Sequence, residues 1–501
     1  MAETTRSSVL AIVKEVTVGT PILPTSGADF VSLQDGFEMV PEFETLENNE
    51  LSDSIGVKAP IIGISAPTSS VSAYFRHSGT EATAPAYDEL IEVAVGEKVA
   101  AHATERALTT GSTAGTSSAA ATLVFNTGHG ADFQRGKAVL LKDATNGYSI
   151  RNIASMSTDT ATLAFNLAAA PASGVNTGRA ILYKPANTPP SLTMSLYRAN
   201  GAALEVMAGA RVSEMAIEAT AGELLNMNFS LEGTSYRFDP IEITASTDTL
   251  DFDDGSVKVA TVAAALYQDP LELAESLQTA MNAVSSGITV TYNSSGAAAG
   301  KFTIAKASGT LTLLFATGAN LAQSIAAKIG FAATDLSGFL TYDSTNVQVW
   351  AAPYTQTPDA NINPLVVKAS ELMIGDFKDY GCSSAQSFTL TVSNTLQNVV
   401  DICETSGVSE KLLQQREVTA DVVLTLKRHD AEKFKKFRNG DSITFAFNGG
   451  IKSGVNWVAG RCVNVFMPST SRVTAYSVTD TDGIVTIEMT ITCGEVFVNL
   501  L

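Results

Sequence analysis

Residues 187–240 and 350–501 contain long stretches in which apolar and polar residues alternate. The alternating segments are 191–196, 211–220, 225–231, 387–392, 418–426, 442–447, 458–466, 472–478 and 484–492. Alternation with a period of two places every second side chain on one face of a strand. The pattern therefore predicts long strands, each with one buried face.

Residues 99–186 differ from these regions in being rich in Thr, Ser and Ala. Their apolar runs are short and fall at 121–125, 138–142, 149–155, 161–165 and 179–183. Asn146-Gly147 lies between two of the runs, and this pair favours a tight hairpin turn. The composition and spacing predict a small all-β insert.

Residues 241–349 predict a compact α+β insert. Asp269 is a suitable helix N-cap, Pro270 suits the first helical position and Glu272 completes a capping box. The apolar stripe that follows is Ala274, Leu277, Met281 and Val284. A second helix is predicted at 321–329, with strands at 288–292, 301–305 and 311–315.

Short helices are also expected at 85–94 and 430–438, each followed by a glycine that would end it. In the second of these helices, Phe434 and Phe437 are expected to face inward.

The segment from residue 35 to residue 53 has few apolar residues at either regular period. Its carboxylates are Asp35, Glu38, Glu42, Glu44, Glu47, Glu50 and Asp53. We interpret this acidic arm as a long arm or loop. It is either a solvated surface loop or a segment that is disordered alone and orders on a neighbouring subunit.

Two parts of the chain show a weak internal repeat. Residues 192–195 align with 388–391, and nineteen positions past each aligned Thr stand 212–214 and 408–410, both Val-Ser-Glu. Duplication would give two similar β modules, each with one insert.

The predicted fold class is mainly β, with two similar β modules, a small all-β insert and an α+β insert. The predicted domains are 1–98 (module 1, first part, with the acidic arm), 99–186 (small β insert), 187–240 (module 1, second part), 241–349 (α+β insert) and 350–501 (module 2).

Charge limits the function classes. The 51 acidic and 32 basic side chains give a net charge of −19, which repels nucleic-acid phosphates and anionic membrane surfaces. The longest apolar runs are too short for a bilayer-spanning helix, and the first eight residues do not have the pattern of an export signal. The four cysteines have no metal-ligand spacing, and reduced thiols are expected.

No motif predicts enzyme chemistry, a cofactor or a metal. Residues 296–302 resemble a phosphate-binding loop, but the second Gly comes one residue early and no hydroxyl follows the Lys. Residues 251–255 resemble a calcium loop, yet Val262 occupies the position of the required acid. The four histidines are scattered along the chain. The sequence alone does not exclude a glycosidase, which needs two catalytic carboxylates facing each other across a groove.

The order of several features carries a family resemblance. They are Glu15-Val16-Thr17-Val18-Gly19-Thr20-Pro21, the acidic arm, the helix near Leu90, the strand 191–196, the run 209–214 before a strand, and the C-terminal sequence of strands 387–392, 417–422 and 458–468 around the helix with Phe434. In this order the chain resembles the tail tube (major tail) proteins of long-tailed, non-contractile phages (siphophages), with a Chi-like phage as a candidate source. The match covers 1–98, 187–240 and 364–501, and the inserts resemble accessory domains of phage virion proteins.

The resemblance implies a self-assembling structural protein. In that family, a β-sandwich or barrel module with a short flanking helix joins its neighbours edge to edge into a ring. Two such modules in this chain imply a ring of three chains with pseudo-sixfold symmetry, with six chains as the alternative. Rings would be made in the host cytoplasm and stack around a tape-measure protein in the virion tail. The tube would contact tail-tip and tail-terminator proteins and conduct genomic DNA without binding it specifically.

The same resemblance implies roles for acidic residues. Glu214 and Glu218, together with Glu410 or Glu417, are the candidates expected to approach the lumen, the alternative being outer solvent or a neighbouring subunit. The acidic arm is expected to contact the next ring. A baseplate or tail-tip ring protein is the main alternative, and a surface-layer or adhesin-type protein, which needs an export signal, is another.

Overall fold

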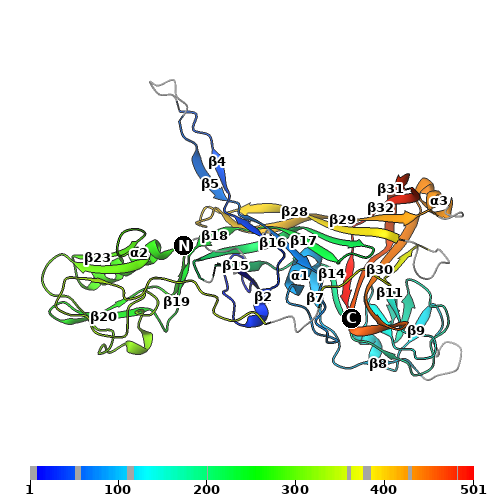
Figure 1. Cartoon of the computed structure of the whole chain (residues 1–501), viewed down its shortest axis with the longest axis horizontal. Helices are drawn as coiled ribbons and strands as arrows, with labels where there is room; N and C mark the ends of the chain where they lie inside the picture. Colours follow the sequence, from blue (N-terminus) through cyan, green and yellow to red (C-terminus); the bar gives the residue numbers. More distant parts are fainter. Residues whose placement is uncertain are drawn as a thin grey trace. The chain divides into compact units, whose positions relative to one another are not determined.

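The computed structural model of the 501-residue chain describes residues 8–35, 37–50, 58–109, 118–199, 201–357, 363–375, 385–426, 431–481 and 483–501. Asp53, Cys382 and His429 lie outside these residues. The described chain is mainly β, which confirms the predicted class (Figure 1). Its helices are α1 (Asp88–Val95), α2 (Pro270–Val284) and α3 (Ala431–Asn439), with 3-10 turns η2 (Gly27–Asp29), η3 (His129–Asp132) and η4 (Leu321–Gln323).

The chain divides into two compact units. Unit 1 comprises Met1–Ala11, Met194–Met207 and Tyr236–Thr355, and unit 2 comprises Ile12–Thr193, Ala208–Ser235 and Gln356–Leu501. The α+β insert lies in unit 1. Residues 194–196 of the predicted strand 191–196 also lie in unit 1, whereas the small β insert and the other predicted long strands lie in unit 2. The predicted domain boundaries stay a prediction.

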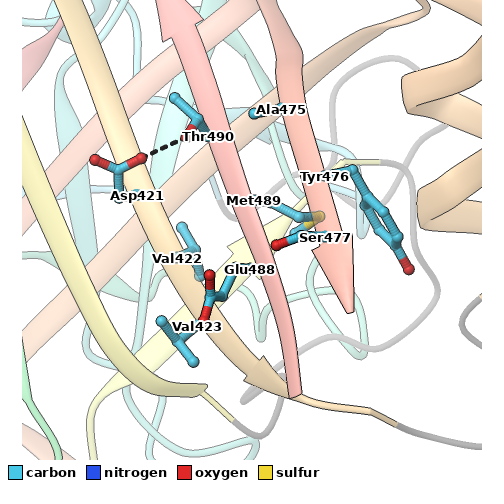
Figure 2. Close-up of a pocket in the computed structure, with 9 residues that line it drawn as sticks. All are labelled: Asp421, Val422, Val423, Ala475, Tyr476, Ser477, Glu488, Met489 and Thr490. Atoms are coloured by element: carbon cyan, nitrogen blue, oxygen red, sulfur yellow. Dashed lines mark hydrogen bonds between the residues drawn. The ribbon is translucent and has the colours of Figure 1, made fainter. Parts of the chain in front are cut away.

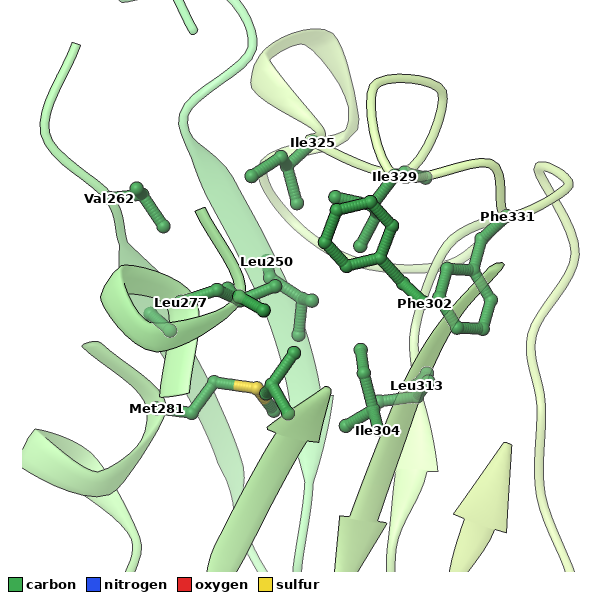
Figure 3. Close-up of a cluster of buried hydrophobic side chains, with 14 of the residues drawn as sticks. Leu250, Val262, Leu277, Met281, Phe302, Ile304, Leu313, Ile325, Ile329 and Phe331 are labelled. Carbon is green, nitrogen blue, oxygen red and sulfur yellow. The ribbon is translucent and has the colours of Figure 1, made fainter. Parts of the chain in front are cut away.

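Unit 1 is built around α2. The Asp269 carboxylate accepts hydrogen bonds from the backbone N–H groups of Leu271 (2.8 Å) and Glu272 (2.9 Å), as the capping pattern predicted. Leu277 and Met281 of α2 belong to the buried cluster of Figure 3. The strands are β19 (Ile241–Ile243), β20 (Thr249–Asp253), β21 (Val257–Thr261), β22 (Ala265–Tyr267), β23 (Ile288–Asn293), β24 (Lys301–Lys306), β25 (Thr312–Leu313) and β26 (Thr341–Asp343).

The prediction of a second helix at 321–329 in this insert is wrong. Only η4 forms, because Ser324 is extended and makes a parallel bridge with Thr249. Ile325 and Ile329 are buried all the same, so their apolar spacing reflects burial without a helix. The calcium-like residues 251–255 form the β20–β21 hairpin, and the phosphate-loop-like residues precede β24, as expected for turns.

The small β insert is a six-stranded antiparallel sheet in the order β8-β13-β10-β11-β12-β9. Its strands are β8 (Arg106–Ala107), β9 (Thr122–Val124), β10 (Ala138–Leu141), β11 (Ser149–Ser157), β12 (Thr160–Leu163) and β13 (Asn176–Thr177). Asn152 donates to Asn464 at 2.7 Å, and Asn464 is also hydrogen-bonded to Asn448 and Asn499. All four amides are fully buried, so a satisfied polar network fixes the insert to the rest of unit 2.

The main element of unit 2 is an antiparallel sheet of eight strands, which we call the long sheet. Its order is β3-β6-β17-β16-β28-β29-β32-β31. The strands are β3 (Glu38–Val40), β6 (Thr68–Tyr74), β17 (Asn226–Glu232), β16 (Ala203–Thr220), β28 (Ala385–Val400), β29 (Val408–Thr425), β32 (Ile484–Cys493) and β31 (Asn456–Thr481).

A second sheet shares β31, whose 26 residues pass from one sheet into the other. It contains β27 (Glu371–Ile374), β30 (Ser442–Ser453), β33 (Phe497–Leu500), β14 (Ile181–Pro185) and β7 (Gly96–Val99), in the order β27-β30-β31-β33-β14-β7. The other strands are β1 (Val9–Lys14), β2 (Phe30–Val31), β4 (Phe43–Leu46), β5 (Ile61–Ser65), β15 (Leu192–Arg198) and β18 (Ser235–Phe238).

The long sheet repeats its own topology. The half β3-β6-β17-β16 and the half β28-β29-β32-β31 have the same pairing, with β6 leading to α1 and β29 leading to α3. In each half the fourth strand precedes the third in the sequence and pairs with it. The two halves are joined by β16 and β28.

Both halves contain a β-bulge at the same place. The extra residue is Ser213 in β16 and Thr474 in β31. Each hydroxyl donates to the carbonyl opposite, Ser213 to Ser230 at 3.2 Å and Thr474 to Thr490 at 3.3 Å. Because a bulge is a specific feature of a strand pair, the shared bulge identifies β16 with β31 and β17 with β32.

The alignment of the repeat in the sequence analysis is therefore wrong. It equates 212–214 with 408–410, whereas the structure equates 211–213 (Arg-Val-Ser) with 472–474 (Arg-Val-Thr). Alternating sequences match one another in any even register, and only the pairing of the strands distinguishes the registers.

Within the acidic arm, Glu38–Val40 form β3 of the long sheet and Phe43–Leu46 form β4, the first strand of a hairpin. β4 and β5 pair antiparallel, with Thr45 opposite Ile62, and project from unit 2 (Figure 1). Phe434 of α3 is less buried than expected. It is 46% exposed and contacts the ring of Tyr476, as Phe437 does.

Candidate functional site

The long sheet has one apolar and one polar face. On the apolar face lie buried side chains such as Met215, Phe229, Leu390 and Val422. The polar face carries small hydroxyl and amide side chains, among them Ser70, Ser72, Asn226, Asn228, Thr389, Thr391, Thr419 and Thr490. Strand alternation puts them on one face because the eight strands pair in register.

Acidic residues lie in rows across the junction of the two halves. Ser393 of β28 is opposite both Glu214 of β16 and Glu417 of β29. Four residues away along β28, Thr389 is opposite both Glu218 and Asp421. Glu214, Glu417 and Asp421 are exposed, so the carboxylates form two rows on the polar face.

Uncharged donors hold several of these carboxylates. Asn228 donates to Glu218 at 3.2 Å, and Thr490 donates to Asp421 at 2.5 Å. Thr479 of β31 likewise donates to Glu488 at 2.9 Å. Hydroxyl and amide donors orient a carboxylate without cancelling its charge, so the negative charge of the face is retained.

Most of the paired core of this sheet carries no basic residue, although the exposed Arg472 of β31 lies opposite Thr492 at the end of the β31–β32 ladder. The segments 68–74, 214–220, 226–232, 387–393, 418–425, 475–481 and 486–492 contain no Lys, Arg or His. The whole chain has 32 Lys and Arg, and an ordinary solvated face mixes both signs of charge. Within these segments the charged side chains of the polar face are therefore all acidic.

The structure brings together three of the four predicted lumen residues. Glu214, Glu218 and Glu417 share the polar face. Glu410 does not join their rows, because it lies opposite Val399 and is 3.6 Å from the guanidinium of Arg211. Whether these residues face a lumen stays a prediction.

The sequence analysis missed Asp421 and Glu488. Asp421 lies within the predicted strand 418–426, in alternation with the buried Ala420 and Val422. Its place on the polar face could have been read from that pattern. Its position in the same row as Glu218 could not, because it depends on the pairing of β16 with β28.

A hollow of about 330 Å³ lies along β29, β32 and β31 (Figure 2). Its lining includes Asp421, Glu488 and Thr490, whereas the ring of Tyr476 points away from them. The lining offers hydroxyls and carboxylates but no basic group, so it does not suit a phosphate.

The acidic arm residues are spread over several elements. Glu38 lies in β3 opposite Ser70, and Glu44 lies in β4. Glu50 forms an ion pair with Lys58 at 2.5 Å. The described arm acids that are exposed are Asp35, Glu38, Glu42, Glu44, Glu47 and Glu50, and Asp53 lies outside the described residues.

Apolar side chains of the arm hairpin are exposed together with its acids. Phe43 and Leu46 of β4 are 50% and 55% exposed, and Ile61 and Ile62 of β5 are 55% and 69% exposed. Exposed apolar side chains clustered on one element mark an interaction site.

Within the described ranges, no group of three or more His, Cys, Asp or Glu residues could hold a metal ion. No described helix is long and apolar enough to cross a membrane. Cys462 and Cys493 are buried free thiols and Cys403 is an exposed one. Comparison of the sequence with protein-family models gave no match, and comparison with curated proteins gave no significant relative.

Proposed function

We propose that the chain is a tail tube protein of a non-contractile phage tail. Stacked rings of this chain would polymerise around a tape-measure protein between tail-tip and tail-terminator proteins, and the tube would later conduct genomic DNA. The observation that supports this most is the repeated long sheet, whose two halves join edge to edge within one chain. A chain that contains one such junction already has the interface that a ring requires.

The size of the closed sheet favours three chains. Strands are spaced about 4.8 Å apart, so three copies of eight strands give a circumference of about 115 Å and a diameter of about 37 Å before strand tilt widens it. Such a barrel leaves an aqueous channel once side chains are subtracted. Six copies would double the diameter, which is far more than one DNA duplex requires.

The anionic polar face suits a conduit for DNA. Basic side chains would bind phosphates and impose a desorption barrier at every ring, whereas carboxylates repel the backbone. We place this face toward the lumen, with Glu214, Glu218, Glu417 and Asp421 as its charged residues.

Electron microscopy of the purified protein tests the proposal. Long hollow tubes are expected. Isolated rings would favour the alternative of a baseplate or tail-tip protein, which shares the sheet but does not stack. Monomers at high concentration would contradict both functions.

A further inference from the structure

The long sheet contains one junction whose register is known. β16 and β28 meet antiparallel, with Ala216 opposite Thr391, Ile217 opposite Leu390, and Glu218 opposite Thr389. At this junction Ile217, on the apolar face of β16, is only 1% exposed.

The corresponding edge of the second half belongs to β31. Counted from the shared bulge, residues 475–481 of β31 correspond to 214–220 of β16. Within the described ranges, no strand pairs with the outer side of residues 477–479. Val478, the counterpart of Ile217, is 54% exposed although it lies opposite the buried Ile487. An unpaired strand edge with an exposed apolar residue is a template for another strand.

The first half ends in the matching edge, β3. Met39 of β3 lies opposite Ser69 of β6, and Leu390 of β28 lies opposite Ala420 of β29. The two pairs are equivalent, because each lies in the same row of cross-strand neighbours relative to the bulge of its own half. Residues 37–40 (Phe-Glu-Met-Val) therefore correspond to 388–391 (Phe-Thr-Leu-Thr). β3 pairs with β6 on one side, and no described strand pairs with its other side.

We infer that the outer edge of β31 binds β3 of a second copy of this chain, in the register that β16 and β28 display. The antiparallel pairs are Ser477 with Val40, Val478 with Met39, and Thr479 with Glu38. This inference rests on the proposed function, because it specifies the contact that closes the ring. The strand directions are compatible with this contact. β31 is the counterpart of β16 and β3 is the counterpart of β28, so β31 and β3 of the next copy would also meet antiparallel.

The two helices support the same contact. In α1, seven of eight residues are buried, and the Asn394 amide of β28 donates to the Ala94 carbonyl at 3.0 Å. α3 follows β29 as α1 follows β6, yet Phe434 is 46% exposed. A second copy bound to the edge of β31 would lie beside α3, just as β28 lies beside α1. The ring of Phe434, exposed in the single chain, would then be covered by that copy.

The contact is heterologous, because each copy uses β31 toward one neighbour and β3 toward the other. Heterologous contacts close into rings when the rotation per copy divides a full turn. The partner is therefore a second copy of this chain and not an unrelated strand.

Paired cysteines test the register. In a background with Cys382→Ser and Cys403→Ser, Val40→Cys with Ser477→Cys is expected to give disulfide-linked oligomers that end at a covalent trimer. Ala216→Cys with Thr391→Cys is the matched control, because these residues form the equivalent pair within one chain and should give a disulfide-linked monomer. Val40→Cys with Thr479→Cys, two residues out of register, should link poorly.

A second variant avoids dependence on disulfide geometry. Val478→Lys places a charge on the apolar side of the contact, and the single chain should fold because this side chain is exposed in it. Assembly measured by sedimentation is expected to fall at least tenfold. Val455→Lys, at a residue that is 77% exposed in a hairpin turn, should assemble like the unmodified chain.

The outcomes separate the inference from the proposed function. Tubes that form without linking Val40→Cys to Ser477→Cys, or that tolerate Val478→Lys, would overturn the register and leave the tube function intact. An unmodified chain that stays monomeric would overturn the tube function. Linked oligomers together with loss of assembly in Val478→Lys would support both.

Discussion

At the scale of single residues, Glu89 is a carboxyl group that burial keeps from ionising. Burial, followed by the negative charge of Asp88, raises the pKa of Glu89 to about 7. One of its oxygens is buried without a hydrogen-bond partner. The neighbouring acids Asp88 and Glu92 are instead paired with Lys98 and Lys14.

The raised pKa of Glu89 gives a stability effect with a defined sign. The folded chain binds this proton more tightly than the unfolded chain, whose pKa is near 4.5. The free energy of unfolding therefore falls as the pH rises from about 4.5 to about 7, and stays low above that. Glu89→Gln should remove this loss and be more stable than the unmodified chain at pH 8, on the order of 2 kcal/mol.

Thermal unfolding at pH 4 and pH 8 measures the effect of Glu89→Gln. Glu47→Gln, at an exposed arm position, serves as the control and should change little at either pH. A difference between Glu89→Gln and the unmodified chain that is the same at both pH values would show that Glu89 ionises normally.

At the scale of elements, local signals were predicted well and tertiary ones were not. α2 was predicted because its cap and apolar stripe lie within one continuous segment. The predicted helix at 321–329 has the same kind of stripe, but the bridge of Ser324 to Thr249 replaces it. A sequence pattern does not contain that distant competitor.

The repeat shows the same limit. Alternation predicted the long strands, but the equivalence of β16 with β31 depends on a bulge and on cross-strand pairing. Its only clear sequence trace is Arg-Val-Ser at 211–213 and Arg-Val-Thr at 472–474. For the same reason the sequence grouped Glu410 with Glu214, Glu218 and Glu417, although it lies outside their rows, and did not single out Asp421.

The arm hairpin allows a prediction about stacking. Phe43 and Ile62 are exposed in the single chain, so Phe43→Ser with Ile62→Ser should leave thermal unfolding of the monomer within about 1 kcal/mol, as exposed substitutions do. If the arm contacts the next ring, the variant should form rings but much shorter tubes, measured by electron microscopy.

Val257→Ser with Phe339→Ser is the matched control, because both residues are exposed in unit 1. Normal tube lengths in the arm variant would exclude the arm as a contact between rings. Shortened tubes in the control would mean that general surface hydrophobicity is responsible.

At the scale of the whole molecule, the sign of charge on the polar face should govern DNA passage. Glu214→Lys with Glu218→Lys places one cation in each of the two acidic rows of that face. Tubes should still form, because both positions are solvent-exposed or partly so, but DNA ejection should slow at low salt and recover at high salt, since phosphate contacts weaken with salt.

Glu242→Lys with Glu275→Lys, at exposed positions of unit 1, makes the same change in net charge elsewhere. Ejection rates from phage particles carrying each variant are the measurement. Equal rates for the two variants would remove the polar face from the lumen.

The rotational symmetry of a tube in cross-section tests the central claim most directly. Threefold symmetry with six similar sheet segments around the lumen is expected, because each chain supplies two halves of the long sheet. Averaged electron micrographs of end-on tubes distinguish this from strict sixfold symmetry. A strictly sixfold ring of six chains, or a ring whose lumen is not lined by the long sheet, would contradict it.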